Sequence, residues 1–317
     1  MSIKLEYGVP TDRSGVNVRF GIEKGFFAEE GMDVSVRVIF GGPEISAAYD
    51  SGELKIGELG TPPGITAIGH GQRFKIIGSG LPRGIGLFFL VRSDLNSWND
   101  LKGQTLGSLS IGSCSYWYLR EMLTQNAIDP DNDVKIRGLG NDYPRQFELF
   151  EAGEIAALLS TEPNVTIGEA RGLVKTWGNV LSLANVPQLQ WVIQVANDEL
   201  LRNEPDLVRK FLRIAQRASR YLADHPEEWV EFNAMLFGIT REIAARSVAR
   251  ERPTLHFDGQ LDRPGLERAI ALQHHLGAIK EMLPLNYFVA EGFQPPPTYP
   301  AEVELQTKDS GPGYAVA

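Results

Sequence analysis

The chain has 317 residues, which is long enough for two domains of ordinary size. Its hydrophobic content of 43% and charged content of 22% are typical of a globular protein in water. The 31 basic and 40 acidic side chains give a net charge of −9, which argues against a nucleic-acid surface or an anionic membrane as a partner. No apolar run approaches the roughly 20 residues of a membrane span, so we expect no membrane insertion.

Cysteine and histidine are scarce. The one cysteine, Cys114, excludes an intramolecular disulfide, and the five histidines are scattered without metal-ligand spacing. We therefore expect no metal and no cofactor.

The first residues bear on localisation. Residues 1–7 lead almost directly into the first expected strand, without the charged and apolar regions of a signal peptide. Two localisations stay open: cytoplasmic, or periplasmic if a signal peptide has been removed from the sequence.

The first 91 residues alternate between strand and helix patterns. Apolar alternation and β-branched runs predict strands over residues 4–9, 34–40, 54–59, 74–78 and 86–91. Helical spacing predicts helices over residues 16–27 and 44–51, and a third that ends near Gly69. This alternation favours βαβ units in an α/β fold, whose ligands lie beyond the carboxyl ends of the strands.

Three polar or glycine-rich corners follow the first three strands. They are residues 11–15, 41–43 and 60–63, and their candidate ligand contacts are Arg13, Ser14, Gly42 and Thr61.

The stretch 102–123 contains a fourth candidate contact. Residues 104–109 are predicted to form a buried strand, and helical spacing begins near Ser115, with Ser113 or Ser115 as the N-cap. A loop before a helix directs backbone N–H groups and the helix dipole toward one point, which favours an anion. We therefore expect an acidic ligand group on the backbone of Gly112, Ser113 and Cys114.

The C-terminal third is predicted to be mostly helical. A β-branched run at residues 192–195 precedes expected helices over 206–222, 226–237, 240–251 and 266–283. Residues 302–317 are polar, and we expect them to be loosely held.

Several short motifs occur in a recognisable order. They are K-G-F-F-A-E-E-G from Lys24, G-G-P from Gly41, G-E-L-G-T-P-P from Gly57, D-L-K-G from Asp100, G-S from Gly112, G-E-I-A-A from Gly153 and T-E-P from Thr161. In this order the chain resembles type 2 periplasmic binding proteins, and in particular the branch that serves nitrate, sulfonate, taurine and thiamine-pyrimidine ABC importers. The resemblance covers about residues 4–229.

The resemblance implies a two-lobed α/β fold with mixed sheets, two crossovers and a ligand cleft between the lobes. Lobe one would comprise residues 1–91 and 192–300, lobe two residues 92–191, and residues 301–317 a loosely held tail. It also implies capture of a small-molecule ligand by hinge closure, and an ABC permease as a possible partner.

Further candidate residues leave the charge of the ligand open. Arg13 and Arg83 lie in turns where a guanidinium could grip a carboxylate or sulfonate. Trp191, Tyr116 and Tyr143 could form an aromatic wall. Asp12, Asp142 and Glu162 could instead serve a cationic ligand, or simply cap helices and form turns.

An enzyme on the same fold is the alternative function. Cys114 lies in the first turn of its expected helix, where a thiol pKa can fall to roughly 3.5–7.5, but no base can be placed beside it. Enzymes that resemble this scaffold include a desulfinase of aromatic sulfinates, menaquinone-biosynthesis enzymes and thiamine-pyrimidine synthases. The desulfinase has a cysteine just after its first strand, where this chain reads Val9-Pro10-Thr11-Asp12, and the Cys/His-rich segment and His–Lys pair of the synthases are not found.

Overall fold

The computed structural model describes residues 2–80, 83–84, 86–140, 142–183, 189–256 and 260–294. The chain divides into two compact units. Unit 1 comprises Met1–Gly86, Gly112–Cys114 and Leu189–Pro296, and unit 2 comprises Leu87–Ile111 and Ser115–Gln188. The chain thus leaves unit 1 after Gly86, contributes Gly112–Cys114 to it, and returns to it at Leu189.

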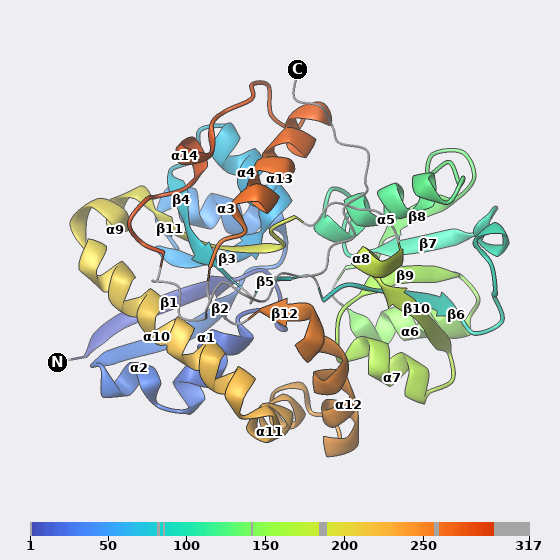
Figure 1. The fold of residues 1–317 in the computed structure, drawn as a ribbon, viewed down its shortest axis with the longest axis horizontal. Helices are drawn as coiled ribbons and strands as arrows, with labels where there is room; N and C mark the ends of the chain where they lie inside the picture. The colour runs from blue at the N-terminus through green and yellow to red at the C-terminus, as the bar shows by residue number, and fades with distance from the viewer. Residues whose placement is uncertain are drawn as a thin grey trace. The chain divides into compact units, whose positions relative to one another are not determined.

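Unit 1 is built on a five-stranded mixed sheet with the strand order β2-β1-β3-β11-β4 (Figure 1). Its strands are β1 (Ile3–Val9), β2 (Met32–Val38), β3 (Ile56–Gly60), β4 (Phe74–Ser79) and β11 (Val192–Asn197). β1 runs parallel to β2 and β3, whereas β11 runs antiparallel to β3 and β4. The carboxyl ends of β1, β2 and β3 therefore lie at one edge of the sheet.

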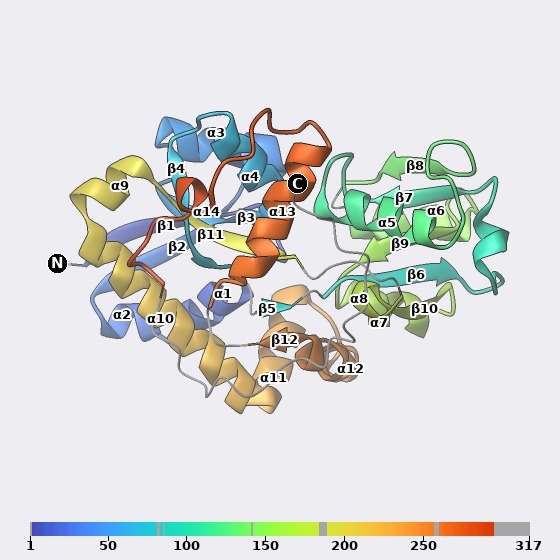
Figure 2. The ribbon, with the colours of Figure 1, turned by 45° about the horizontal axis from the view of Figure 1, so that its top comes forward.

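Helices cover both faces of this sheet. The early ones are α1 (Val16–Glu23), α2 (Phe26–Glu29), α3 (Gly42–Ser51) and α4 (Thr61–Gly69). After β11 come α9 (Asp198–Asn203), α10 (Pro205–Asp224), α11 (Pro226–Phe237), α12 (Arg241–Glu251), α13 (Arg263–His275) and α14 (Leu285–Phe288). Figures 1 and 2 both show α3 and α4 on one face of the sheet, and α1, α2 and α10 on the other.

The core of unit 1 joins α10 to the first strand and helices. The ring of Phe211 on α10 stacks on Tyr7 of β1 at 5.1 Å, and it also lies 5.3 Å from the ring of Phe27. All three side chains are buried. Burial of such large apolar surfaces is the main stabilising contribution to folding.

Unit 2 contains a second five-stranded mixed sheet, with the order β10-β6-β9-β7-β8. Its strands are β6 (Phe88–Arg92), β7 (Thr105–Ser108), β8 (Lys135–Gly138), β9 (Ala157–Ser160) and β10 (Val174–Asn179). Its helices are η1 (Trp98–Leu101), α5 (Cys114–Gln125), α6 (Tyr143–Glu151), α7 (Asn164–Ala170) and α8 (Val180–Leu183). Two short strands, β5 (Arg83–Gly84) and β12 (Leu255–His256), pair with each other in unit 1, and η2 (Arg252–Thr254) precedes β12.

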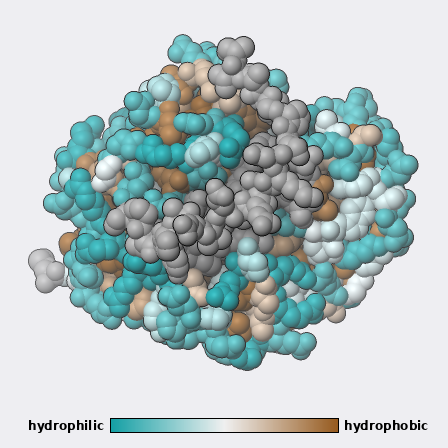
Figure 3. Space-filling view, viewed as in Figure 1, coloured by the Kyte–Doolittle hydropathy of each residue, from teal (hydrophilic) through white to brown (hydrophobic). Residues whose placement is uncertain are grey.

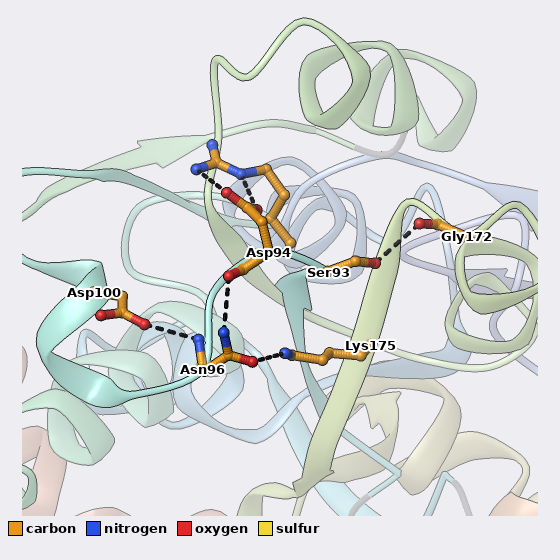
Figure 4. Close-up of polar contacts among 7 residues, drawn as sticks. Ser93, Asp94, Asn96, Asp100, Gly172 and Lys175 are labelled. Carbon is orange, nitrogen blue, oxygen red and sulfur yellow. Dashed lines mark hydrogen bonds and ion pairs between the residues drawn. The ribbon is translucent and has the colours of Figure 1, made fainter.

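The loop after β6 is held to β10 by a polar network (Figure 4). Asn96 is its centre, because its Nδ2 donates to the backbone oxygen of Asp94 at 3.0 Å and its Oδ1 accepts from Nζ of Lys175 at 2.7 Å. The backbone N–H of Asn96 donates to the carboxylate of Asp100, which also caps η1. Local hydrogen bonds of this kind fix the D-L-K-G stretch at the start of unit 2.

The described surface in Figure 3 is mostly hydrophilic, with small apolar areas among the polar residues. None of the helices in the part of the chain that the structure describes is both long and apolar enough to cross a bilayer.

Two helix predictions are wrong in their extent. The helix expected over residues 16–27 is two helices, because Gly25 adopts a φ of 75°, a left-handed conformation that ends α1. The helix expected over 266–283 ends at His275, and Gly277 with a φ of 72° turns the chain away. The prediction for residues 301–317 lies outside the described residues.

Candidate functional site

The first corner of unit 1 is a compact polar turn formed by residues 11–15. The Oγ atoms of Thr11 and Ser14 lie 2.8 Å apart, and the backbone N–H of Arg13 donates to Thr11 Oγ1. Arg19 on α1 donates from Nε to the backbone oxygen of Ser14 at 2.9 Å. These bonds arrange the turn directly above the N-terminus of α1, which follows Gly15.

Arg13 lies in this turn, as the sequence predicts. Its guanidinium carbon lies 5.0 Å from the centre of the Phe237 ring, so a cation–π contact orients the side chain. The 11–15 turn therefore contains one cation, with its side chain packed on the end of α11. Arg83 forms backbone pairs with His256 in the β5–β12 ribbon, and its side chain lies outside the described part of the chain.

The second and third corners provide close backbone approaches. Gly41 adopts a φ of 98°, and a Cβ on Gly42 would lie 2.6 Å from Cβ of Pro63, so the two corners pack tightly together. Thr61 is fully buried, and its backbone N–H donates to the backbone oxygen of Trp191 at 3.0 Å. Its Oγ1 has no hydrogen-bond partner among the described residues.

Cys114 lies against the same corner. Its Sγ is 3.9 Å from the backbone oxygen of Trp191, and a Cβ on Gly60 would approach this sulfur to 3.3 Å. Unit 1 therefore brings together Gly60, Thr61, Cys114 and the half-buried Trp191, although they are far apart in sequence.

The thiol of Cys114 is not activated as a nucleophile. Burial raises its pKa from 9.0 to about 12, and interactions with the backbone only partly offset this effect. Burial thus shifts the thiol pKa of this half-buried residue in the opposite direction to the lowering considered for a helix start. At neutral pH this residue is a neutral thiol.

The segment Gly112–Cys114 belongs to unit 1, and Cys114 is the first residue of α5, so that Ser113 precedes the helix. Gly112 adopts a φ of 83°, a left-handed conformation that favours glycine, and no atom would crowd a Cβ there. Ser115, the other expected N-cap, instead accepts the backbone N–H of Leu109 through its Oγ at 2.9 Å.

Three candidates, Tyr116, Tyr143 and Glu162, lie in unit 2. Tyr116 accepts from Arg120 and packs edge-on against Trp117. Tyr143 is the first residue of α6 and is buried. The buried carboxylate of Glu162 accepts from the N–H and hydroxyl of Thr166, at 3.2 and 3.0 Å.

The capping alternative holds for Asp142. It is the N-cap of α6, and its carboxylate accepts the backbone N–H of Arg145 at 3.0 Å. Asp12 is exposed on the 11–15 turn.

Two residues near the corners were not predicted from the sequence. Phe40 immediately precedes the 41–43 corner, and 56% of its surface is exposed, which is unusual for a large apolar side chain. Glu58 lies in the middle of β3 and is fully buried, with its carboxylate directly below the 11–15 turn. The sequence feature that could have identified Glu58 is a single acidic residue within the apolar pattern of β3.

The carboxylate of Glu58 accepts two hydrogen bonds. The backbone N–H of Gly15 donates to Oε1 at 2.7 Å, and the hydroxyl of Tyr7 donates to Oε2 at 3.0 Å. Burial raises the pKa of Glu58 to about 7, although these two hydrogen bonds and the charge of Arg19 lower it. Within the described ranges, no group of three or more His, Cys, Asp or Glu side chains is arranged to hold a metal ion.

Comparison with solved structures identifies the fold. The periplasmic aliphatic sulphonate binding protein SsuA of Escherichia coli superposes with a TM-score of 0.74 over 98% of this chain and 97% of its own, at 15% sequence identity. The prediction of a two-lobed binding-protein fold is thereby confirmed.

Comparison with curated proteins gives relatives of two kinds. YtlA of Bacillus subtilis, which is named as a binding protein, is 25% identical over 209 residues, covering 64% of this chain and 60% of YtlA. The 4-amino-5-hydroxymethyl-2-methylpyrimidine phosphate synthase of Candida albicans is 24% identical over 230 residues, covering 66% of this chain and 64% of the synthase. The chain thus spans less than two thirds of the length of these relatives.

A protein family described as NMT1/THI5 like matches residues 17–229, which are more than half of the chain. The match includes the 41–43 and 60–63 corners but not the 11–15 turn. The chain belongs to the NMT1/THI5-like family.

Proposed function

We propose that this protein is a solute-binding protein that captures a small organic acid, a carboxylate or sulfonate, for an ABC-type importer. The observation that carries the proposal is the concentration of glycines, close backbone approaches and a cation at the corners of unit 1, in a fold shared with a sulphonate-binding protein. The sulphonate specificity belongs to SsuA, and it guides the choice of ligand class here.

The binding group for the acid would be the backbone around Gly112, Ser113 and Cys114, with Arg13, Ser14, Gly42 and Thr61 as further contacts. Backbone N–H groups at a helix start bind anions without a lysine, which suits an acidic protein. The exposed ring of Phe40 beside Gly41 would contact an apolar part of the ligand. Arg83, Tyr116, Tyr143, Glu162 and Trp191 stay candidate contacts under this proposal.

The state of Cys114 supports binding over covalent catalysis. A neutral thiol with a pKa of about 12 is a poor nucleophile at neutral pH. Transport would place the protein outside the cytoplasmic membrane, beside a permease that receives the ligand.

Binding is tested by calorimetry with a panel of alkanesulfonates, aryl sulfonates, carboxylates and matched amines. Saturable binding of one acid, with unchanged ligand recovered afterwards, supports the proposal. Binding confined to amines, or conversion of a bound acid to product, contradicts it and favours the enzyme alternative.

Gly112→Ala tests the position of the acid. Alanine at a φ of 83° strains the loop, so we expect at least a tenfold loss of affinity for the acid, about 1.4 kcal/mol. Gly172→Ala is the matched control, because Gly172 has a φ of 70° and equally open space, but lies between α7 and β10. Equal affinities in the two variants would place the acid elsewhere.

A further inference from the structure

Glu58 occupies the place where an anion would bind at the N-terminus of α1. Gly15 precedes the first residue of this helix, and its backbone N–H donates to Glu58 Oε1 rather than to a ligand. The protein therefore places its own carboxylate beneath the 11–15 turn, one residue away from Ser14.

The surroundings of Glu58 do not neutralise it fully. Among the side chains that the structure describes, none forms an ion pair with its carboxylate, and Arg19 is the cation whose charge reaches it. Arg19 of α1 attracts Glu58, but its guanidinium is bonded to the Ser14 oxygen and is also attracted to Asp12. The negative charge of Glu58 therefore contributes to the electrostatic potential at the 11–15 turn.

The remaining neighbours are neutral groups. From β1, Tyr7 donates to the carboxylate and accepts from Gln194 of β11 at 3.2 Å. From α3, the hydroxyl of Tyr49 bonds to the backbone oxygens of Gly8 and Glu58. Gly80, which follows β4, also lies beside the carboxylate, because a Cβ at this position would be 3.2 Å from Oε2. Since glycine has no side chain, it places no charged or polar group there. Among the side chains that the structure describes, Arg19 is the charged group whose field reaches Glu58, and Tyr7 and Tyr49 are titratable but neutral.

We propose that capture of an acidic ligand, with Arg13 and Ser14 of the 11–15 turn among its contacts, takes up one proton, and that Glu58 is the group that receives it. This inference rests on the proposed function, since it requires the ligand to be an acid. A second negative charge beside a buried carboxylate favours the protonated form of that carboxylate. Linkage is reciprocal, so protonation of Glu58 favours the acid by the same factor.

The direction of the pH dependence follows. The pKa of Glu58 is about 7 without ligand, and the acid raises it further. Below that pH Glu58 already carries its proton and affinity is full, whereas above it each binding event must draw a proton from water. Affinity therefore falls as the pH rises, by up to about tenfold for each pKa unit by which the ligand shifts Glu58.

The test uses butanesulfonate, which keeps its charge throughout the range, and calorimetry at about pH 6 and about pH 8.5 in buffers of different ionisation enthalpy. We expect three- to tenfold weaker binding at the higher pH, roughly as one half to one pKa unit of coupling gives, with proton uptake near pH 7.5. Glu58→Gln keeps an oxygen for the Gly15 N–H and cannot titrate, so its affinity should be independent of pH. Glu242→Gln removes an exposed carboxylate of α12 in the same unit and should keep the pH dependence of the wild type.

A second measurement needs no ligand. The amide proton resonance of Gly15 should shift with pH in the wild type, with a midpoint near 7, and stay constant in Glu58→Gln. Sulfonate binding without proton uptake, or a Gly15 resonance that does not titrate, overturns the role of Glu58 and leaves the proposed function standing. Failure of every acid to bind, while Gly15 titrates, overturns the proposed function and the proton linkage with it.

Discussion

At the scale of single residues, Glu58 should make the stability of the protein depend on pH. Its pKa is about 7 in the folded protein against 4.5 for an ordinary glutamate, so between these values the folded state binds the proton and the unfolded state does not. Stability should therefore fall as the pH rises from about 4.5 to about 7, and this contribution levels off above 7. The difference of about 2.5 pKa units corresponds to a loss on the order of 3 kcal/mol.

Urea unfolding of the wild type and of Glu58→Gln across this range measures that contribution. The wild-type free energy of unfolding should decline relative to the variant, because glutamine does not titrate. Parallel curves for the two proteins would mean that Glu58 ionises with an ordinary pKa.

Cys114 should be unreactive. Because burial raises its thiol pKa to about 12, alkylation by iodoacetamide at pH 8 should be much slower than that of a free thiol, and Cys114→Ser should keep ligand affinity within about tenfold. Mass spectrometry follows the alkylation and calorimetry the affinity. Fast alkylation, or a turnover that vanishes in the variant, would restore the enzyme alternative.

At the scale of elements, α10 stabilises unit 1 through its apolar face. Phe211→Ala removes a fully buried ring that stacks on Tyr7 and contacts Phe27, so we expect a loss of about 3–5 kcal/mol in the free energy of unfolding. Met235→Ala on the neighbouring α11 is the control, since Met235 is 59% exposed, and should change stability by less than about 0.5 kcal/mol. Denaturant titration compares them, and similar values for the two variants would contradict this account of the core.

Elements with a strong period could be predicted from the sequence. The alternation and β-branched residues of β1, β2 and β11, and the helical spacing of α10 and α11, are local signals that survive in the structure. Helix ends were less predictable, because Gly25 and Gly277 adopt left-handed φ angles that the pattern of apolar residues does not reveal.

The site was predictable only in part. The 11–15, 41–43 and 60–63 corners follow from strand order, because parallel strands end at one edge of a sheet. The contact of Cys114 with Trp191 joins residues 77 positions apart, and the pKa of its thiol depends on that packing. The role of Glu58 could not be predicted from the sequence, because it depends on a hydrogen bond from the backbone N–H of Gly15, 43 residues away.

At the scale of the whole molecule, the proposed function predicts movement at the two crossings between the units. Ligand capture by hinge bending near Gly86 and Leu189 should reduce the radius of gyration. Small-angle scattering with and without an acid that binds in calorimetry measures this change. An unchanged radius with saturating ligand would show that capture occurs without closure.

The position of β11 has a consequence for biosynthesis. This strand pairs with β3 on one side and β4 on the other, yet it follows the whole of unit 2 in the chain. During synthesis on the ribosome, the residues of unit 2 emerge as one nearly continuous run. Throughout that time β4 and one edge of β3 remain unpaired, because β11 has not yet been synthesised. Unit 2 can therefore fold early, whereas the nascent unit 1 exposes strand edges that invite pairing with other chains until residues 192–197 arrive.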